Sequence, residues 1–312
     1  MIKDTKNSFL LDLTERLSRS LQDFEPERAA RHVGFLMNFQ QPDGGFSGRR
    51  GGSDLYYTGF AVRGLALLGA LDRPRCAAIA NYLKGAVKRR SFNLIDLTSW
   101  FYSAITIQTR SGLVAFDGDQ DSVANEVASA LESFRRADGG YAKTHEGGAG
   151  STYHTFLAVL CYEMLDRTPP DIPAIARFLL ARRRDDGGFV EIGPMKQSGA
   201  NPTAAAAVLL NRFAAIDGEA LRGIESYLQS VRGVEGGLRA NTQIPFCDLL
   251  STFTGLLVAH DLGLSGVIDQ EACRRYVNQL ELSGGGFRGA AWDSEADPEY
   301  TFYGLGALAL LA

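Results

Sequence analysis

Two kinds of apolar segment alternate along the chain, and both are long enough to form helices. In the first kind, apolar residues recur at helical spacing beside charged ones, as where Ile175 and Phe178 flank Arg177. Such amphipathic helices bury one face and expose the other to water. Segments of this kind run over residues 123–134, 175–183, 221–231 and 273–280.

The second kind of segment is apolar on nearly every side, interrupted mainly by small residues and by Thr, Ser and Tyr. A helix with this composition is buried on every side. The alternation therefore predicts two concentric rings, in which outer helices face water and inner helices wall a central cavity. The inner segments run over residues 56–71, 96–107, 152–165, 202–213, 249–262 and 298–311.

Turns with two adjacent glycines separate these segments at a nearly constant interval. The first glycine of each pair lies at position 44, 139, 187, 236 or 285, so the intervals are 95, 48, 49 and 49 residues. Because the first interval is about twice the others, we expect a degenerate copy at Arg90-Ser91-Phe92-Asn93. Six repeats of this period are typical of helical-pair or propeller arrays.

The double-glycine turns have a structural interpretation. A glycine after a helix adopts the left-handed conformation that ends it, and a second glycine permits close approach of the neighbouring repeat. Aromatic residues that follow the turns are expected to be buried between repeats: Phe46, Tyr141, Phe189 and Phe287.

The repeat also predicts the domain organisation. It continues without a break from residue 26, which indicates a single domain over residues 26–312. Residues 1–25 precede it, and their segment Asn7–Leu21 predicts a short amphipathic helix that packs on the barrel at the first repeat.

Composition restricts the partners and the compartment. A net charge of −4 provides no electrostatic basis for binding nucleic acid. The four cysteines form no CxxC pair, which favours free thiols in a reducing cytoplasm. Asp12 and Glu15 interrupt the N-terminal segment, so it is not a signal peptide, and no later segment is long enough to cross a membrane. We expect a cytoplasmic protein.

An outer helix, a Q-x-x-D-G-G-F-like turn, a polar loop and an inner helix make up each unit. This unit resembles the repeat of the protein prenyltransferase β subunits and the terpene (squalene) cyclases. The resemblance rests on Gln40-Gln41-Pro42-Asp43-Gly44-Gly45-Phe46 and on Gly285-Gly286-Phe287 followed by Asp297-Pro298-Glu299-Tyr300-Thr301. The latter ending is similar to that of geranylgeranyltransferase β subunits. The resemblance implies an all-α fold over residues 26–312, an α/α toroid (α6–α6 barrel) of six helical hairpins.

The same resemblance implies where a zinc site would lie. Family transferases use an Asp, a Cys two residues later and a His in a D-P-x-H-T segment to hold an acceptor cysteine as thiolate. Asp248 matches the Asp, but Leu250 and Tyr300 occupy the other two positions. Asp248, with Cys247 beside it as a substitute ligand, is a remnant of the site, so we expect no zinc and expect Asp248 to cap its helix.

Two basic residues correspond to the diphosphate pocket of the family, which uses a His in the fourth repeat and an Arg, Lys and Tyr in the fifth. Here Gln197 and Ser251 replace the His and the Tyr. Arg239 remains in the fifth-repeat loop, and Lys196 in the preceding loop supplies a second cation. We expect Lys196 and Arg239 to bind a diphosphate; the alternative is that both are solvated loop charges.

Cyclase chemistry needs a different signal. Class II cyclases protonate an alkene with a D-x-D-D cluster that opens an inner helix, where crowding raises the pKa of one carboxyl. The inner helices here open with single acids, so Asp297 joins Asp248 and Tyr300 as a candidate catalytic residue. The acidic run 117–121 precedes an outer helix, which Asp121 and Ser122 are expected to cap; a magnesium site stays open as an alternative.

Aromatic residues of the inner helices are expected to line an apolar cavity suited to a prenyl chain, because each buried CH₂ contributes about 0.8 kcal/mol. The alternative is that they fill the space between the two rings of helices. The residues expected to line the cavity are Tyr56, Trp100, Tyr102, Tyr153, Phe253, Tyr300 and Tyr303.

These features predict a prenyltransferase-like protein that binds an isoprenoid, in the form of a prenyl diphosphate, in its central cavity. If it is an enzyme, it would transfer the prenyl group without zinc–thiolate chemistry. Two alternatives are a non-catalytic binding or scaffold toroid and a small terpene cyclase. The resemblance also leaves a helical-repeat α-type subunit open as a partner.

Overall fold

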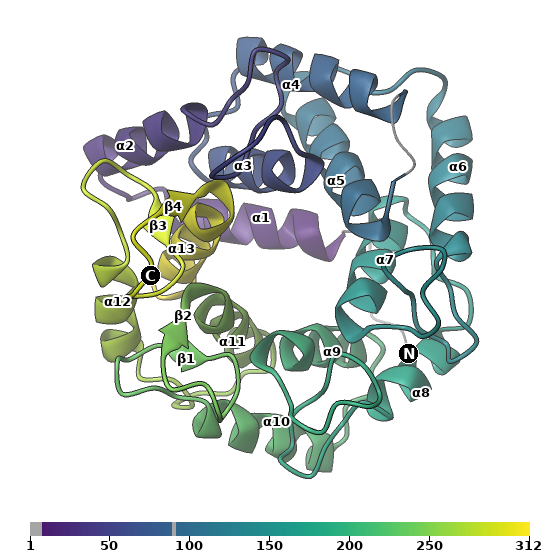
Figure 1. The fold of residues 1–312 in the computed structure, drawn as a ribbon, viewed down its shortest axis with the longest axis vertical. Helices are drawn as coiled ribbons and strands as arrows, with labels where there is room; N and C mark the ends of the chain where they lie inside the picture. The colour runs from purple at the N-terminus through teal and green to yellow at the C-terminus, as the bar shows by residue number, and fades with distance from the viewer. Residues whose placement is uncertain (1–7, 89–91) are drawn as a thin grey trace.

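The computed structural model describes residues 8–88 and 92–312, and these form the predicted α/α toroid (Figure 1). Each inner helix packs against the next, and the last packs against the first, so the ring is closed. The outer ring consists of α2 (Pro26–Met37), α4 (Arg73–Val87), α6 (Gln120–Ser133), α8 (Ile172–Leu180), α10 (Gly218–Ser230) and α12 (Gln270–Gln279). The inner ring consists of α3 (Leu55–Leu67), α5 (Leu94–Ser111), α7 (Thr152–Met164), α9 (Ala200–Arg212), α11 (Leu249–Asp261) and α13 (Pro298–Leu310).

Burial follows the two patterns seen in the sequence. The outer helix α12 buries only Cys273, Tyr276 and Val277, which lie on one face. The inner helix α13, by contrast, buries most of its residues, from Pro298 to Ala309. The polarity of each segment therefore determines which ring it joins, because only the inner helices are covered on all sides.

A threonine in each of five inner helices ties the helix to the turn before it. In α9, the Oγ1 of Thr203 accepts a hydrogen bond of 2.9 Å from the backbone N–H of Phe189, which follows the double glycine. The same bond recurs, at 2.9 to 3.2 Å, from Phe46, Tyr141, Leu238 and Phe287 to Thr58, Thr155, Thr252 and Thr301. This periodic threonine is a second sequence signal of the repeat, beside the double glycine.

The double-glycine turns bring successive repeats into backbone contact. Gly187 has a φ of +85°, and a Cβ there would lie 2.2 Å from the carbonyl oxygen of Gly223 in α10, the next outer helix. Gly188 faces the ring of Tyr227 on the same helix. The aromatic residues after the turns are fully buried, as predicted: Phe46, Tyr141, Phe189 and Phe287. In the last two turns, β1 (Leu238–Arg239) pairs with β2 (Cys247–Asp248), and β3 (Phe287–Arg288) pairs with β4 (Ala296–Asp297).

The same contact closes the ring between the last repeat and the first. A Cβ at Gly285 would lie 2.4 Å from the carbonyl oxygen of Arg31 in α2. His32 accepts a hydrogen bond of 2.9 Å from the backbone N–H of Gly286 and stacks on Phe287 with 5.1 Å between ring centroids. Glu281 is partly buried, yet hydrogen bonds from His32 and Arg28 lower its pKa to about 2. The turn of the sixth repeat therefore packs on α2 in the same way as each earlier double-glycine turn packs on the next outer helix.

The second repeat departs from the pattern. Two residues of its predicted degenerate turn Arg90-Ser91-Phe92-Asn93, namely Arg90 and Ser91, lie outside the described residues, which resume at residue 92. Asn93 caps α5, accepting hydrogen bonds from the backbone N–H groups of Ile95 and Asp96. Without a double-glycine turn, the linker from α4 to α5 is short, and α5 is 18 residues long.

The acidic run before α6 is arranged differently from the prediction. Asp119 is the N-cap and accepts a hydrogen bond of 2.9 Å from the backbone N–H of Ser122. Asp121 and Ser122, the predicted caps, lie inside the first turn, because the helix begins at Gln120, ahead of both. Asp117 forms an ion pair of 2.9 Å with Lys88.

The N-terminal helix α1 (Phe9–Ser20) crosses one end of the toroid, behind the central opening in Figure 1. It contacts α3, α7 and α13, so it reaches well beyond the first repeat. Its buried face includes Phe9, Leu13 and Leu17. No helix of the described residues is long and apolar enough to cross a membrane.

The backbone contact at Gly187 generates a prediction about stability. Gly187→Ala should lower the free energy of unfolding by about 2–4 kcal/mol, because the new Cβ meets the α10 carbonyl and φ is positive. Gly148→Ala is the matched control, since a Cβ at Gly148 meets nothing within 4 Å. Urea denaturation of both variants measures the difference, and equal stability would contradict the proposed role of the turn.

Candidate binding cavity

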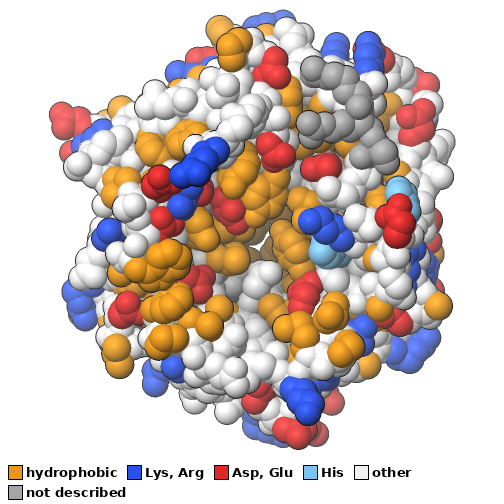
Figure 2. Space-filling view, in the orientation of Figure 1, with side chains coloured by type: hydrophobic (Ala, Val, Ile, Leu, Met, Phe, Trp, Pro, Cys, Tyr) orange, Lys and Arg blue, Asp and Glu red, His pale blue; other side chains and the backbone are white. Residues whose placement is uncertain are grey.

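A cavity of about 90 Å³ lies at the centre of the toroid, among the inner helices. Its walls are mainly apolar and include Ala204 and Ala205 of α9, Leu250 of α11 and Phe302 of α13. Phe9, Leu10 and Leu13 of α1 also line it, so the N-terminal helix forms its closed end. Figure 2 shows the opposite face, where hydrophobic side chains surround the central hollow.

A wider and more polar groove of about 610 Å³ lies on the face where the inner helices begin. Its residues include Arg49, Tyr57, Trp292 and Tyr300. The side chain of Trp292 is 69% exposed and makes an edge-to-face contact with Phe246, with 5.7 Å between ring centroids. We call this groove the mouth.

Glu299 is the carboxyl group placed between the mouth and the central cavity. It lines the mouth, and the Tyr56 hydroxyl donates a hydrogen bond of 2.6 Å to its Oε1. Tyr303, which lines the cavity, also favours the charged form of this carboxyl. Burial raises the pKa of Glu299 to about 7, so a large fraction of the molecules carry it protonated at neutral pH. Such a group can give or take a proton.

Asp297, the predicted acid, has a structural role instead. It is 3% exposed, and its side chain caps α13 by accepting a hydrogen bond of 2.9 Å from the backbone N–H of Tyr300. Its other oxygen pairs with Arg49 at 2.9 Å, and Arg49 also forms a bidentate pair with Asp293. The Arg49 guanidinium is thus engaged by two carboxylates.

The predicted zinc remnant does not form a metal site. Asp248 caps α11 and accepts hydrogen bonds of 2.7 and 2.8 Å from the backbone N–H and the hydroxyl of Ser251. The Cys247 thiol is buried, and burial raises its pKa to about 12, which opposes the thiolate that zinc requires. Leu250 has no ligand atom, and Tyr300 faces the mouth. Among the described residues, no group of three or more His, Cys, Asp or Glu side chains could hold a metal ion.

The structure does not place the two predicted diphosphate ligands in the cavity. Arg239 donates hydrogen bonds to the carbonyl oxygens of Ser230 and Val231, at the end of α10, with the shorter one at 2.7 Å. Lys196 is exposed in the loop before α9. Neither residue belongs to the wall of the central cavity or of the mouth.

The predicted aromatic residues divide among several surfaces. Tyr153, Phe253 and Tyr303 line the cavity. Tyr56 holds Glu299, and Tyr300 lines the mouth.

The two predicted aromatics on α5 point away from the cavity. Trp100 points toward the outer ring, where its Nε1 donates a hydrogen bond of 3.2 Å to the carbonyl of Leu83. Tyr102 faces α1, and its hydroxyl lies 2.9 Å from the Oγ1 of Thr14.

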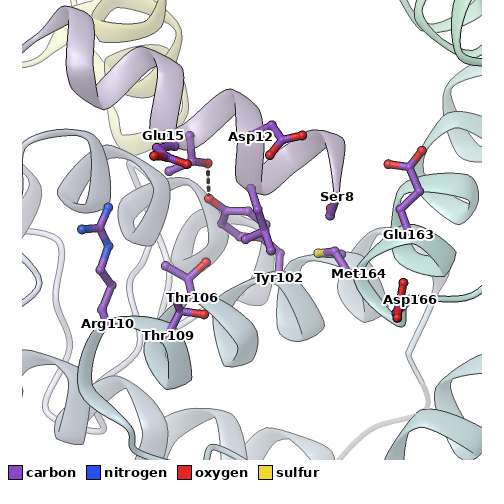
Figure 3. A pocket seen from close by; sticks show the side chains of 12 residues that line it. Ser8, Asp12, Glu15, Tyr102, Thr106, Thr109, Arg110, Glu163, Met164 and Asp166 are labelled. Carbon is purple, nitrogen blue, oxygen red and sulfur yellow. Dashed lines mark hydrogen bonds between the residues drawn. The ribbon is translucent and has the colours of Figure 1, made fainter. Parts of the chain in front are cut away.

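A groove lies beneath α1, between this helix and the ends of α5 and α7 (Figure 3). We call it the acidic groove. Carboxylates of Asp12, Glu15, Glu163 and Asp166 surround it, together with Arg110. Glu163 accepts hydrogen bonds from Arg212, at 2.5 Å, and from the backbone N–H of Phe9. Tyr102 separates this groove from the interior of the toroid, since it lines the groove and packs against Arg63.

A serine–histidine pair at the start of α7 does not form a nucleophilic site. Ser151 Oγ lies 2.6 Å from His154 Nδ1 and donates its hydrogen to Glu191. The Ser151 hydroxyl also accepts a hydrogen bond of 3.2 Å from the backbone N–H of His154, so it serves as the N-cap of α7. Burial lowers the pKa of His154 to about 4, and its imidazole is neutral at neutral pH.

Comparisons with known proteins agree with this architecture. Among solved structures, the chain is similar to Candida albicans protein geranylgeranyltransferase-I complexed with GGPP, with 15% identity, a TM-score of 0.70 and 90% of each chain covered. It is also similar to a variant of the type II terpene cyclase MstE from Scytonema in complex with geranylgeranyl dihydroxybenzoate, with 12% identity and a TM-score of 0.63. That match covers 97% of this chain and 98% of the cyclase.

A protein from Actinoplanes is similar as well, with 15% identity, a TM-score of 0.59 and coverage of 91% of this chain and 97% of that one. Comparison with curated protein sequences gives no match. At these identities the structural likeness shows the fold alone. The family is shown by sequence, because residues 9–312 match the model of the prenyltransferase alpha-alpha toroid domain. The chain therefore belongs to the prenyltransferase alpha-alpha toroid family.

Proposed function

We propose that the protein binds an isoprenoid chain in its central cavity. The observation that carries the proposal is the apolar wall contributed by five inner helices and closed by α1. The proposal draws support from two proteins of the same fold, of which one is complexed with GGPP and the other with geranylgeranyl dihydroxybenzoate. Surface of this kind favours a hydrocarbon chain, since each buried CH₂ contributes about 0.8 kcal/mol.

The volumes of the central cavity and of the mouth determine where such a chain would lie. The free space of the central cavity is about 90 Å³, and that of the mouth is about 610 Å³. A chain of several isoprene units would therefore occupy both, passing Glu299 and Tyr303 between them. Ala204 and Ala205 keep the α9 side of the wall open, because their side chains end at Cβ.

Binding of the chain has more support from the geometry than transfer of a prenyl group from a diphosphate. A diphosphate at the mouth would meet Asp293, Asp297 and Glu299, while Arg49 is already engaged by the first two. Lys196 and Arg239 lie outside both walls. A cysteine of this chain is also disfavoured as the nucleophile that would accept a prenyl group, since burial raises the pKa of the Cys161 and Cys273 thiols to about 12. A non-catalytic binding toroid is consistent with all three observations.

One observation favours a second candidate function, proton transfer to or from a bound isoprenoid, as in a small cyclase. Glu299 is a half-buried carboxyl that can be protonated at neutral pH and stands beside an aromatic cavity. In this candidate Glu299, rather than Asp297, is the acid or base. Incubation with geranylgeranyl substrates and product analysis tests it, and Glu299→Gln should abolish any product.

Narrowing the cavity should weaken binding of the chain. Ala204→Phe adds a ring to the α9 wall and should reduce affinity for geranylgeraniol at least tenfold, measured by titration calorimetry. Val234→Phe is the control, since Val234 is fully exposed on a turn. Thermal unfolding verifies that both variants are folded. The proposal is wrong if the wild type binds neither geranylgeraniol nor geranylgeranyl diphosphate.

The two basic loop residues give a separate test of diphosphate recognition. If the protein recognises the chain alone, Lys196→Ala and Arg239→Ala should leave affinity for geranylgeranyl diphosphate within twofold of the wild type. Titration at two salt concentrations provides the control for non-specific charge effects. A tenfold loss in either variant would assign that residue to the diphosphate.

Glu299 should make stability depend on pH. Its pKa is raised from an ordinary 4.5 to about 7, so the folded state binds the proton more tightly than the unfolded state. Its contribution is fully present below pH 4.5 and is lost as the pH rises through 7, by up to about 3 kcal/mol. Glu299→Gln removes this loss and keeps an acceptor for Tyr56. The variant should therefore gain stability relative to the wild type between pH 5 and pH 8 in urea denaturation; parallel curves would contradict the raised pKa.

A further inference from the structure

We infer that Arg63 is the binding site for a carboxylate group at the closed end of the central cavity. Arg63 lies on α3 and lines the cavity together with Phe9, Leu10 and Leu13 of α1. It stands seven residues along the helix from Tyr56, which places it about 10 Å deeper than the Glu299–Tyr56 pair. The inference rests on the proposed function, since it specifies the chemical class of the isoprenoid.

Among residues 8–88 and 92–312, the guanidinium of Arg63 has no polar partner. It forms no hydrogen bond and no ion pair with any described residue, and its Nε is buried without a partner. Three aromatic rings surround it instead: those of Tyr102, Phe60 and Phe302, whose centroids lie 4.6, 5.1 and 5.8 Å from Cζ. Aromatic faces attract a cation, but they leave its N–H donors unsatisfied.

The nearby carboxylates are committed elsewhere. Glu163 pairs with Arg212, and Glu15, whose side chain is 62% exposed, pairs with Arg19. Tyr102 stands between Arg63 and the acidic groove, as it packs on the guanidinium and forms part of the groove wall in Figure 3. Glu299 is bound by Tyr56 at the other end of the cavity. No carboxylate of these residues is therefore available to pair with the Arg63 guanidinium.

The charge and the geometry of the Arg63 guanidinium determine which ligand group would pair with it. A guanidinium presents two parallel N–H donors that match the two oxygens of a carboxylate. One carboxylate neutralises one guanidinium, whereas a diphosphate would leave excess negative charge buried among apolar side chains. The ligand we infer is thus an isoprenoid acid with a single negative charge.

This assignment fixes the direction of the ligand. The carboxylate points toward α1, the hydrocarbon chain follows the apolar walls, and the far end of the chain lies at the mouth near Glu299. An isoprenoid bound in this direction presents its terminal unit, rather than its acidic group, to the protonated carboxyl. Exposed groups at the mouth contribute little to recognition of the acid.

The experiment compares three ligands with the same chain. Farnesoic acid, farnesol and farnesyl diphosphate are titrated into the full-length protein by calorimetry at pH 8, where the acid is ionised. We expect farnesoic acid to bind at least tenfold more tightly than farnesol. Arg63→Met should remove this preference and leave the affinity for farnesol within threefold, and Arg63→Lys should keep part of the preference.

Two controls separate the site from general effects of charge and folding. Arg110→Met removes an exposed arginine from the groove beneath α1 and should leave the preference unchanged. Arg63→Met should unfold at a higher temperature than the wild type, because it replaces an unpaired partly buried charge with an apolar side chain of similar length. That result verifies folding of the variant.

The possible results discriminate between the two proposals. Equal affinity for farnesoic acid and farnesol in the wild type, or a preference that survives Arg63→Met, would overturn the carboxylate site while leaving chain binding intact. Tightest binding of farnesyl diphosphate, lost in Arg63→Met, would replace the carboxylate by a diphosphate. Absence of binding by all three ligands would overturn chain binding itself.

Discussion

The contact between each double-glycine turn and the backbone of the next outer helix is the constraint on which the toroid depends. At this contact a carbonyl oxygen occupies the space that any side chain would need, as Gly223 does beside Gly187. The residue after the turn is then buried between the repeats, where its backbone N–H donates a hydrogen bond to the threonine of the inner helix. One short segment therefore sets the spacing of the outer ring, fills the gap between repeats and fixes the start of the inner helix. The angle between successive repeats follows from that spacing, and with it the diameter of the cavity.

The cavity is apolar along its length and polar at its two ends. Glu299 stands at the open end and can be neutral, whereas Arg63 stands at the closed end and is always charged. A carbocation formed deep in the cavity would be repelled by the unpaired guanidinium. It would also find the rings of Phe60, Tyr102 and Phe302 already facing a cation. Carbocation chemistry in the deep part of the cavity is therefore disfavoured unless an anion neutralises Arg63, which makes binding and chemistry at the mouth the more favourable roles.

The repeat pattern was sufficient to predict the toroid, because glycine pairs and helix polarity are local properties of the sequence. The site was harder to predict, since it depends on which way each side chain of an inner helix points. Trp100 and Tyr102 are two residues apart on α5 and point toward the outer ring and toward α1, a difference that an all-round apolar pattern does not contain. The same limit explains why Asp297 was favoured over Glu299: both open α13, but only the latter is free of the helix cap. The role of Arg63 could not be predicted, because a single arginine in an apolar helix belongs to no recognisable motif.

Closure of the ring through His32 and Glu281 has a consequence for how the chain acquires its structure during synthesis. Open repeat arrays have two ends, which specialised terminal repeats must shield from water. A ring has no ends, so none of its repeats needs a polar outer cap, but a nascent chain lacking the last repeat leaves two apolar interfaces uncovered. The first repeat must wait until α12 and α13 have left the ribosome before α2 and α3 are fully covered. Translation of the segment that carries α12 and α13 is thus the step that converts an open, aggregation-prone array into a closed ring.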